Sequence, residues 1–248
     1  MQLYGKDCMD MKLYNKDCLE VFKNIQDGSV NLIITDPPYK VTVHGTSFNH
    51  GMFENKATNQ GIIFEHNDIK VSEYAPEFYR VLKDGSHCYV MCNHINLQSM
   101  LNTFTDVGFH FIKSLIWDKG NKIMGTYYMS QFEYILFFRK GRGVPINNCG
   151  TSDILSIPNI KMKTPTGENY HDTEKPVSLW EILISNSSQK GDVVLDPFMG
   201  IGGAGVAAKK LCRNFIGCEI DSKYFEVAES RILKGYIPDT KRLTKRLF

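Results

Sequence analysis

A strand, a glycine-rich turn and a helix near the carboxyl end constrain the fold of this chain more than any other feature. Residues 192–195 (DVVL) form a short apolar run, and the turn DPFMGIGG follows over Asp196–Gly203. An alanine-rich helix and a second strand, over residues 215–220, are expected next, with Glu219 near the end of that strand. This order is typical of a nucleotide-binding unit, in which the acid lies about 20 residues after the turn and accepts hydrogen bonds from ribose.

The charge of Asp196 separates two kinds of nucleotide ligand. The spacing of glycines over Gly200–Gly205 also fits the G-x-G-x-x-G pattern of dinucleotide-binding dehydrogenases, so a nicotinamide enzyme is an alternative. An acid directly before the turn repels a pyrophosphate and attracts a cation. S-adenosylmethionine carries a sulfonium and an ammonium group, so Asp196 together with Glu219 favours that cofactor. Glycines that merely allow close packing of helix on strand are the remaining alternative.

A second turn is the most specific feature of the chain. The apolar run Val30–Thr35 predicts a buried parallel strand, and Asp36-Pro37-Pro38-Tyr39 ends it. The prolines fix the backbone, so that the Asp36 carboxylate and the Pro37 carbonyl form two acceptors suited to the two hydrogens of an exocyclic amine. Tyr39 offers a ring on which an extruded base can stack. The simpler alternative is a Pro-Pro turn that Asp36 merely caps.

The order of elements predicts an α/β fold with a doubly wound, mostly parallel sheet in one domain over residues 1–248. Two loop regions, residues 40–70 and 141–174, lack periodicity, and residues 1–10 are expected to be a dispensable extension. The remaining expected helices are 72–82, 96–107, the segment after Pro176, and 223–233; the remaining expected strands are 87–93, 111–117 and 133–138.

Composition indicates the cellular location and the state of the cysteines but not the reaction. The net charge is +2, there is no apolar leader, and no apolar run is long enough to cross a bilayer, so a cytoplasmic protein is expected. The seven cysteines include no C-x-x-C pair, which indicates reduced thiols. No metal site is expected, because Cys88 and Cys92 on an extended strand would lie roughly 13 Å apart.

Three motifs together resemble a known family, the DNA amino-methyltransferases. Asp36–Tyr39 (DPPY) resembles its catalytic motif in the form associated with adenine N6, and Asp196–Gly205 resembles its cofactor motif. His171–Pro176 (HDTEKP) resembles the element that precedes the cofactor helix. The catalytic motif comes first, as in the β group of that family, so the resemblance implies a Rossmann-like methyltransferase sheet with circularly permuted motif order.

The resemblance also implies a role for each matching residue. Asp36, Pro37, Pro38 and Tyr39 would handle the target base, and Asp36 would also border the cofactor. The residues implied for S-adenosylmethionine are Asp17 for the adenine, Glu219 and Ile220 for the ribose, Lys175 and Pro176 for the methionine carboxylate, and Asp196, Pro197, Phe198, Gly200 and Gly202 along the turn. Asp17 has the alternative of a simple turn acid.

The family pattern is not followed everywhere, and several questions stay open. Ile201-Gly202-Gly203 replaces the usual S-G-T, and Asp172 replaces a proline. Cytosine N4 in DNA, an RNA or protein amide, and a non-catalytic DNA-binding module are alternatives to adenine. Basic and aromatic residues in or beside the loops are expected to contact DNA, namely Lys119, Lys122, Tyr127, Tyr128, Lys140, Arg142, Lys161 and Lys163. A homodimer, a cognate restriction endonuclease, and a prokaryotic or phage origin fit the resemblance.

Overall fold

The fold is built on one eight-stranded sheet. The computed structural model describes residues 9–38, 69–123, 127–164, 167–171 and 173–235. The strands are β1 (Met11–Tyr14), β2 (Val30–Thr35), β3 (Leu82–Cys92), β4 (His110–Ile123), β5 (Ser130–Arg139), β6 (Ile154–Ser156), β7 (Val193–Asp196) and β8 (Asn214–Cys218). They lie in the order β1-β8-β7-β2-β3-β5-β4-β6, and only β5 runs antiparallel to its neighbours.

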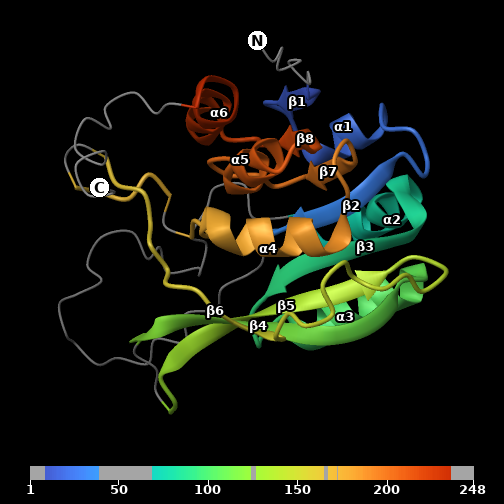
Figure 1. The fold of residues 1–248 in the computed structure, drawn as a ribbon, viewed down its shortest axis with the longest axis horizontal. Helices are drawn as coiled ribbons and strands as arrows, with labels where there is room; N and C mark the ends of the chain where they lie inside the picture. Colours follow the sequence, from blue (N-terminus) through green and yellow to red (C-terminus); the bar gives the residue numbers. More distant parts are fainter. Residues whose placement is uncertain (1–8, 39–68, 124–126, 165–166, 172, 236–248) are drawn as a thin grey trace, which may run out of the picture.

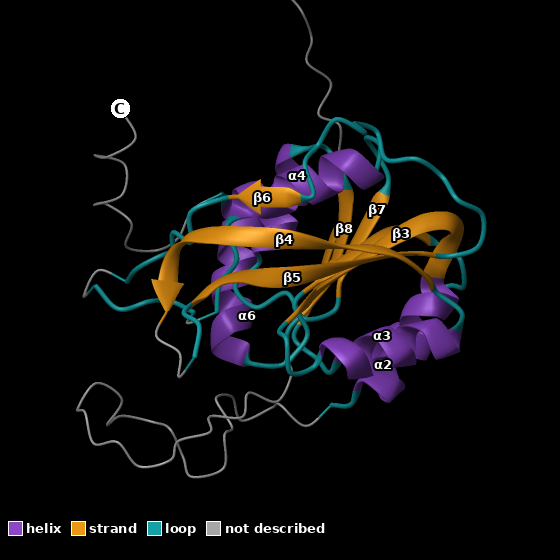
Figure 2. Cartoon of the chain, turned by 90° about the horizontal axis from the view of Figure 1, so that it is seen from below, coloured by secondary structure: helices purple, strands orange, loops and turns teal. Residues whose placement is uncertain are grey.

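Helices cover both faces of the sheet, so the predicted doubly wound α/β class is confirmed (Figures 1 and 2). One core cluster packs side chains of α1 (Cys18–Phe22), α2 (Val71–Val81) and α3 (Leu97–Val107) on one face. A second cluster packs α4 (Val177–Ser187), α5 (Gly203–Lys210), α6 (Ser222–Glu229) and the π-helical turn η1 (Ser230–Lys234) on the other.

The centre of the sheet is the point where the winding reverses. β2 pairs in parallel with β3 on one side and with β7 on the other, although β7 comes some 160 residues later in the chain. From β7 the chain continues outward through α5 to β8, and from β2 it continues the other way to β3. Ligands of open α/β sheets bind at such a switch point, beyond the carboxyl ends of the strands.

The predicted elements differ from the observed ones mainly in the second half of the sheet. β4 and β5 extend well beyond the expected 111–117 and 133–138 and pair as a long antiparallel hairpin. The expected loop at 141–174 contains β6, which adds the last strand to the sheet by pairing with β4. The expected loop at 40–70 lies almost wholly outside the described residues.

The amino-terminal boundary lies close to the predicted one. β1 begins at Met11 and pairs with β8, which places the first and last strands side by side (Figure 1). The Asp10 carbonyl accepts a hydrogen bond from the Phe215 amide, so Asp10 also contacts the sheet. The dispensability of residues 1–10 stays a prediction, and residues 1–8 lie outside the described part. Among the described helices, none is long and apolar enough to cross a membrane.

Candidate active site

Four acidic side chains follow neighbouring strands at the carboxyl edge of the sheet. Asp17 follows β1, Glu219 follows β8, Asp196 ends β7 and Asp36 follows β2. Because these strands are adjacent and parallel, the acids lie along one edge in that order. All four are among the predicted site residues, and the fold brings them to the edge where such sheets bind ligands.

The glycine turn is held in place by Glu219. Its Oε2 accepts a hydrogen bond from the Gly200 amide at 2.9 Å, and its Oε1 accepts one from the Asp221 amide at 2.8 Å. Gly202 has a φ of 78°, and a Cβ there would lie 2.8 Å from Ile232 Cδ1, so only glycine fits. Burial raises the pKa of Glu219. The acid therefore fixes the turn that precedes α5 and still presents a carboxylate at the edge.

Asp196 is a buried acid without a cationic partner among the described residues. Its Oδ1 accepts hydrogen bonds from Thr35 Oγ1 at 2.8 Å and from the Phe198 amide at 3.2 Å. Burial, with smaller repulsion from Asp36 and Glu219, raises the pKa of Asp196 to about 7. A buried carboxylate that lacks a cation is suited to a ligand that brings one, as the sulfonium of S-adenosylmethionine would.

Asp196→Asn is expected to stabilise the unliganded protein at alkaline pH. The Asp196 carboxyl binds its proton more tightly in the folded state, so folding is penalised as pH rises from its ordinary pKa of 3.8 to about 7. Asparagine keeps the Oδ1 acceptor for Thr35 and Phe198 and carries no charge. Urea unfolding should show a gain of about 4 kcal/mol above about pH 7.5 and almost none near pH 4. An equal gain at both pH values would contradict this account.

The Asp36 carboxylate is held on one side and unpaired on the other. The Lys175 ammonium donates to Asp36 Oδ2 at 2.5 Å and to the Thr173 carbonyl at 3.1 Å. Asp36 Oδ1 is buried and has no hydrogen-bond partner among the described residues. Burial raises the pKa of Asp36, which the Lys175 ammonium opposes. Asp36 thus presents one fixed, unsatisfied acceptor beside the buried residue Pro37.

Two charged residues that were not predicted to belong to the site complete this cluster. Glu133 of β5 places Oε2 at 3.4 Å from the Lys175 ammonium and Oε1 at 3.0 Å from the Lys119 ammonium of β4. The Lys119 side chain is only 6% exposed, so its expected role in contacting DNA is wrong. Because alternate residues of a strand share a face, its position two residues after the buried Trp117 could have indicated burial.

The other predicted site residues lie at the same edge with varied exposure. Asp17 caps α1 by accepting from the Leu19 amide at 2.7 Å, as expected of a turn acid, and this does not test its role toward a cofactor. Pro37, Pro176 and Pro197 are buried, Pro38 and Phe198 are half-buried, and Ile220 is exposed. The Phe198 ring packs edge-on against Tyr74 of α2. Tyr39 and Asp172 lie outside the described residues.

A buried ion pair that was not predicted from the sequence contacts the backbone of the glycine turn. Arg231 of η1 donates to the Ile201 carbonyl at 2.7 Å and pairs with Glu174 at 3.1 Å. Glu174 also accepts from the Met162 amide at 2.8 Å, which ties the segment before Lys175 to the turn. Local pattern offers no signal for this pair, because its members are far apart in the sequence.

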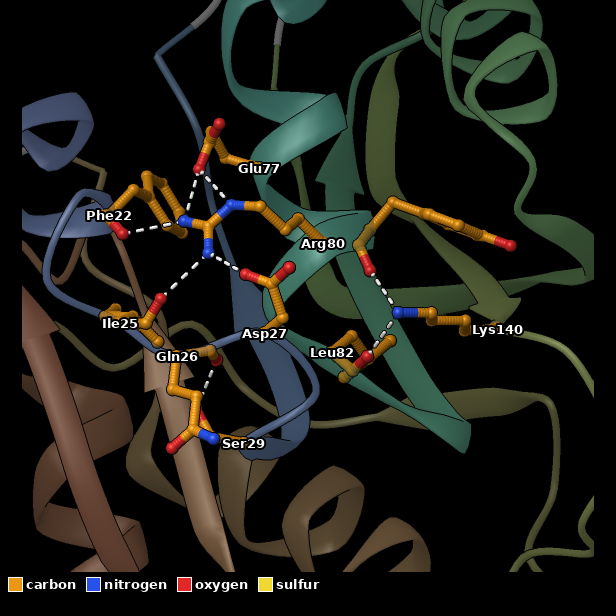
Figure 3. Close-up of polar contacts among 10 residues, drawn as sticks. Phe22, Ile25, Gln26, Asp27, Ser29, Glu77, Arg80, Leu82 and Lys140 are labelled. Atoms are coloured by element: carbon orange, nitrogen blue, oxygen red, sulfur yellow. Dashed lines mark hydrogen bonds and ion pairs between the residues drawn. The ribbon is translucent and has the colours of Figure 1, made fainter.

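The predicted DNA-contacting residues divide between the two ends of the sheet. Lys140 donates to the carbonyls of Tyr79 and Leu82, near the start of β3. Figure 3 shows this contact near Arg80, which pairs with Asp27 and Glu77. That end is opposite to Asp36, so Lys140 does not belong to a DNA-binding surface around the site. Tyr127 and Tyr128 follow β4 at the carboxyl edge and are 93% and 94% exposed.

The site and the fold together define a class of protein. The framework of a nucleoside-cofactor enzyme is present: a doubly wound sheet, a glycine turn, a ribose-type acid, and a buried carboxylate without a cationic partner among the described residues. The chain belongs to the DNA methylase family, whose model matches residues 30–230. It is accordingly a DNA methyltransferase that depends on S-adenosylmethionine, with DNA as its substrate.

Characterised relatives match most of the chain. Type II methyltransferase M2.MboI of Moraxella bovis is 26% identical over 234 residues, which cover 86% of this chain and 84% of that protein. Type II methyltransferase M.HpaI of Haemophilus parainfluenzae is 29% identical over 248 residues, which cover 90% and 74%. Both relatives support the family assignment.

Solved structures show the same fold. The M1.HpyAVI–SAM complex aligns with a TM-score of 0.65 at 24% identity and covers 89% of this chain and 99% of that one. The cytosine-N4-specific PvuII DNA methyltransferase aligns with a TM-score of 0.70 at 18% identity and covers 92% and 88%. Because one of these is specific for cytosine N4, the fold does not identify the target base.

Proposed function

We propose that this chain transfers a methyl group to N6 of adenine in DNA, with the target base extruded from the helix. The observation that carries the proposal is the buried Oδ1 of Asp36, which has no hydrogen-bond partner in the described part of the chain and is fixed by the Lys175 contact to Oδ2. Aspartate as the first residue of the four-residue motif is the form that resembles adenine-N6 enzymes. Cytosine N4 is the second candidate, because the PvuII enzyme has this fold and the same amine chemistry.

The chain's own residues activate the amine. Its lone pair is delocalised into the ring, which makes it a poor nucleophile. Asp36 Oδ1 and the Pro37 carbonyl would accept hydrogen bonds from the two N–H groups of the amine. These bonds favour a tetrahedral nitrogen and stabilise the positive charge that develops on it. One hydrogen then leaves as a proton toward Asp36. The bound cofactor supplies an electrophilic methyl group, and holding the reactants in line contributes the rest of the rate.

The cofactor would be bound along the row of acids. Glu219 and the exposed Ile220 would border the ribose, and Asp17 the adenine. Asp196 would face the cationic part, together with Pro197, Phe198, Gly200 and Gly202 of the turn. The contacts of Lys175 favour a role at Asp36, while Pro176 beside it starts α4. These assignments rest on position at the edge, burial and charge.

DNA would be contacted by the β4–β5 hairpin. Tyr127 and Tyr128 expose nearly their whole side chains at the carboxyl edge of the sheet, and aromatic rings of this kind stack on bases. Lys122 lies exposed near the end of β4 and can approach phosphate.

The proposal also includes three features of the protein's setting. It would form a homodimer, act with a cognate restriction endonuclease and be located in the cytoplasm. Light scattering would test the first, and protection of methylated DNA from a co-encoded nuclease the second.

Product analysis tests the target base. The protein is incubated with labelled S-adenosylmethionine and unmethylated DNA, and the nucleosides are separated. Label in N6-methyladenine supports the proposal, and label only in N4-methylcytosine overturns it. The Asp36→Ala variant, assayed in parallel, controls for contaminating methyltransferases. Sequencing of modified bases in DNA from cells that express the protein would then define the recognition sequence.

A further inference from the structure

Four buried or half-buried charges of alternating sign run across the sheet edge to Asp36. Lys119 contacts Glu133 at 3.0 Å, Glu133 contacts Lys175 at 3.4 Å, and Lys175 contacts Asp36 at 2.5 Å. The two lysine side chains are 6% and 5% exposed, and the two carboxylates 21% and 19%. Each residue comes from a different part of the fold: β4, β5, the segment before α4, and the end of β2.

We propose that Lys119 and Glu133 are positioning residues for catalysis: Glu133 fixes the Lys175 ammonium that contacts Asp36, and Lys119 keeps Asp36 ionised by offsetting the charge of Glu133. Glu133 holds the Lys175 ammonium in place, and Lys119 neutralises Glu133, so that Glu133 does not compete with Asp36 for the Lys175 ammonium. The inference rests on the proposed function of Asp36 as the acceptor for the target amine. Neither Lys119 nor Glu133 needs to touch the substrate for this role.

The charge count explains why Lys119 matters. With all four residues ionised the cluster is neutral, and each carboxylate has a cation in contact. Without Lys119, two carboxylates share one ammonium in a poorly solvated site, and taking up a proton relieves the net negative charge. The Trp117 ring supports both cations, with Lys119 Nζ at 5.7 Å and Lys175 Nζ at 6.0 Å from its centroid.

No other described residue compensates for the loss of Lys119. The remaining titratable groups that interact with Asp36 are Asp196 of β7, Cys92 of β3 and Tyr74 of α2. Each is either neutral or negative near neutral pH. Among the described residues, the cations that favour ionised Asp36 are therefore Lys175 and Lys119 alone.

The test compares pH profiles of methyl transfer for a set of charge variants. Lys119→Met should move the acid limb of kcat to higher pH and lower the rate near pH 6 about tenfold more than near pH 8, since one pK unit is tenfold in protonation. Lys119→Arg should keep the wild-type profile. The double variant Lys119→Met with Glu133→Gln restores neutrality and should return the limb to its wild-type position. Lys113→Met is the control, because Lys113 lies exposed on the same strand and pairs with Asp153.

A second readout does not require turnover. The protonated-carboxyl infrared band that is absent from Asp36→Asn reports the ionisation of Asp36 directly, and its titration should move to higher pH in Lys119→Met and return in the double variant. A uniform loss of rate without a shift in the limb, or a double variant that fails to restore it, overturns the inference. Inactive wild-type protein would instead refute the proposed function. If Lys119→Met does not fold, Lys119→Gln removes the same charge and keeps a polar side chain, and it decides by the same profiles.

Discussion

Asp36→Ala is expected to lower the rate of methyl transfer by about a hundredfold to a thousandfold. The variant removes the acceptor that would hold one amine hydrogen and stabilise the developing positive charge, and losing one such preorganised group costs about 10²–10³ in rate. Lys175 keeps its contact with Glu133, so the fold should survive. Single-turnover assays measure the rate, and calorimetry should show cofactor affinity within about threefold of wild type.

Two controls define what this result means. Asp153→Ala removes an exposed carboxylate that pairs with Lys113 outside the charge cluster at Asp36, and it should leave the rate unchanged. Asp36→Asn retains an oxygen acceptor without the charge and should fall between wild type and alanine. Turnover by Asp36→Ala near the wild-type rate would remove the carboxylate from the mechanism.

Lys175→Met is expected to lower the rate at neutral pH by about a hundredfold and to cost about 3 kcal/mol of stability. Without this ammonium, Asp36 has no cation in contact among the described residues, and Glu133 keeps only Lys119. The buried cluster then carries a net negative charge, so it retains a proton. A raised carboxyl pKa means that the active, ionised form of Asp36 is populated only at higher pH. The loss should therefore shrink as pH rises, unlike the loss in Asp36→Ala.

The pH dependence is the informative measurement for this variant. Methyl transfer is followed from about pH 6 to about pH 9, and unfolding by urea is measured in parallel. Lys210→Met is the matched control, because its ammonium is exposed and pairs with Glu181 at 2.8 Å. A rate deficit that is the same at every pH would show that Lys175 acts on packing rather than on ionisation.

Local sequence pattern predicted the centre of the fold because the physical signals there are local. The apolar run Val30–Thr35 is buried on both faces and stops at two prolines, so β2 has the predicted bounds. The glycine turn requires positive φ at Gly200 and Gly202, which the residue types themselves reveal. Parallel strands then place every acid that follows them at one edge, which is why Asp36, Asp196 and Glu219 could be grouped from the amino-acid sequence alone.

The support of the site was not predictable because it depends on strand register and on long-range contacts. β4 was expected to stop at Trp117, which left Lys119 in a loop, whereas pairing of Trp117 with Glu133 continues the strand through Asp118 and beyond. The Lys175 contact with Asp36 joins residues 139 positions apart. Neither periodicity nor composition carries such information, since two-residue alternation gives a face but not a partner.

The place of β2 in the sheet has a consequence for how the chain is made. Leu32 and Ile33 pair with Val194 and Leu195, so one edge of this mostly apolar strand lacks that partner until about the last fifth of the polypeptide is synthesised. The amino-terminal half, which carries the amine-binding turn, is therefore synthesised before one edge of β2 can be paired. Unpaired apolar strand edges favour aggregation. Nascent chains that stall before residue 196 should accordingly depend on chaperones, and carboxyl-terminal truncation should yield insoluble protein rather than a smaller enzyme.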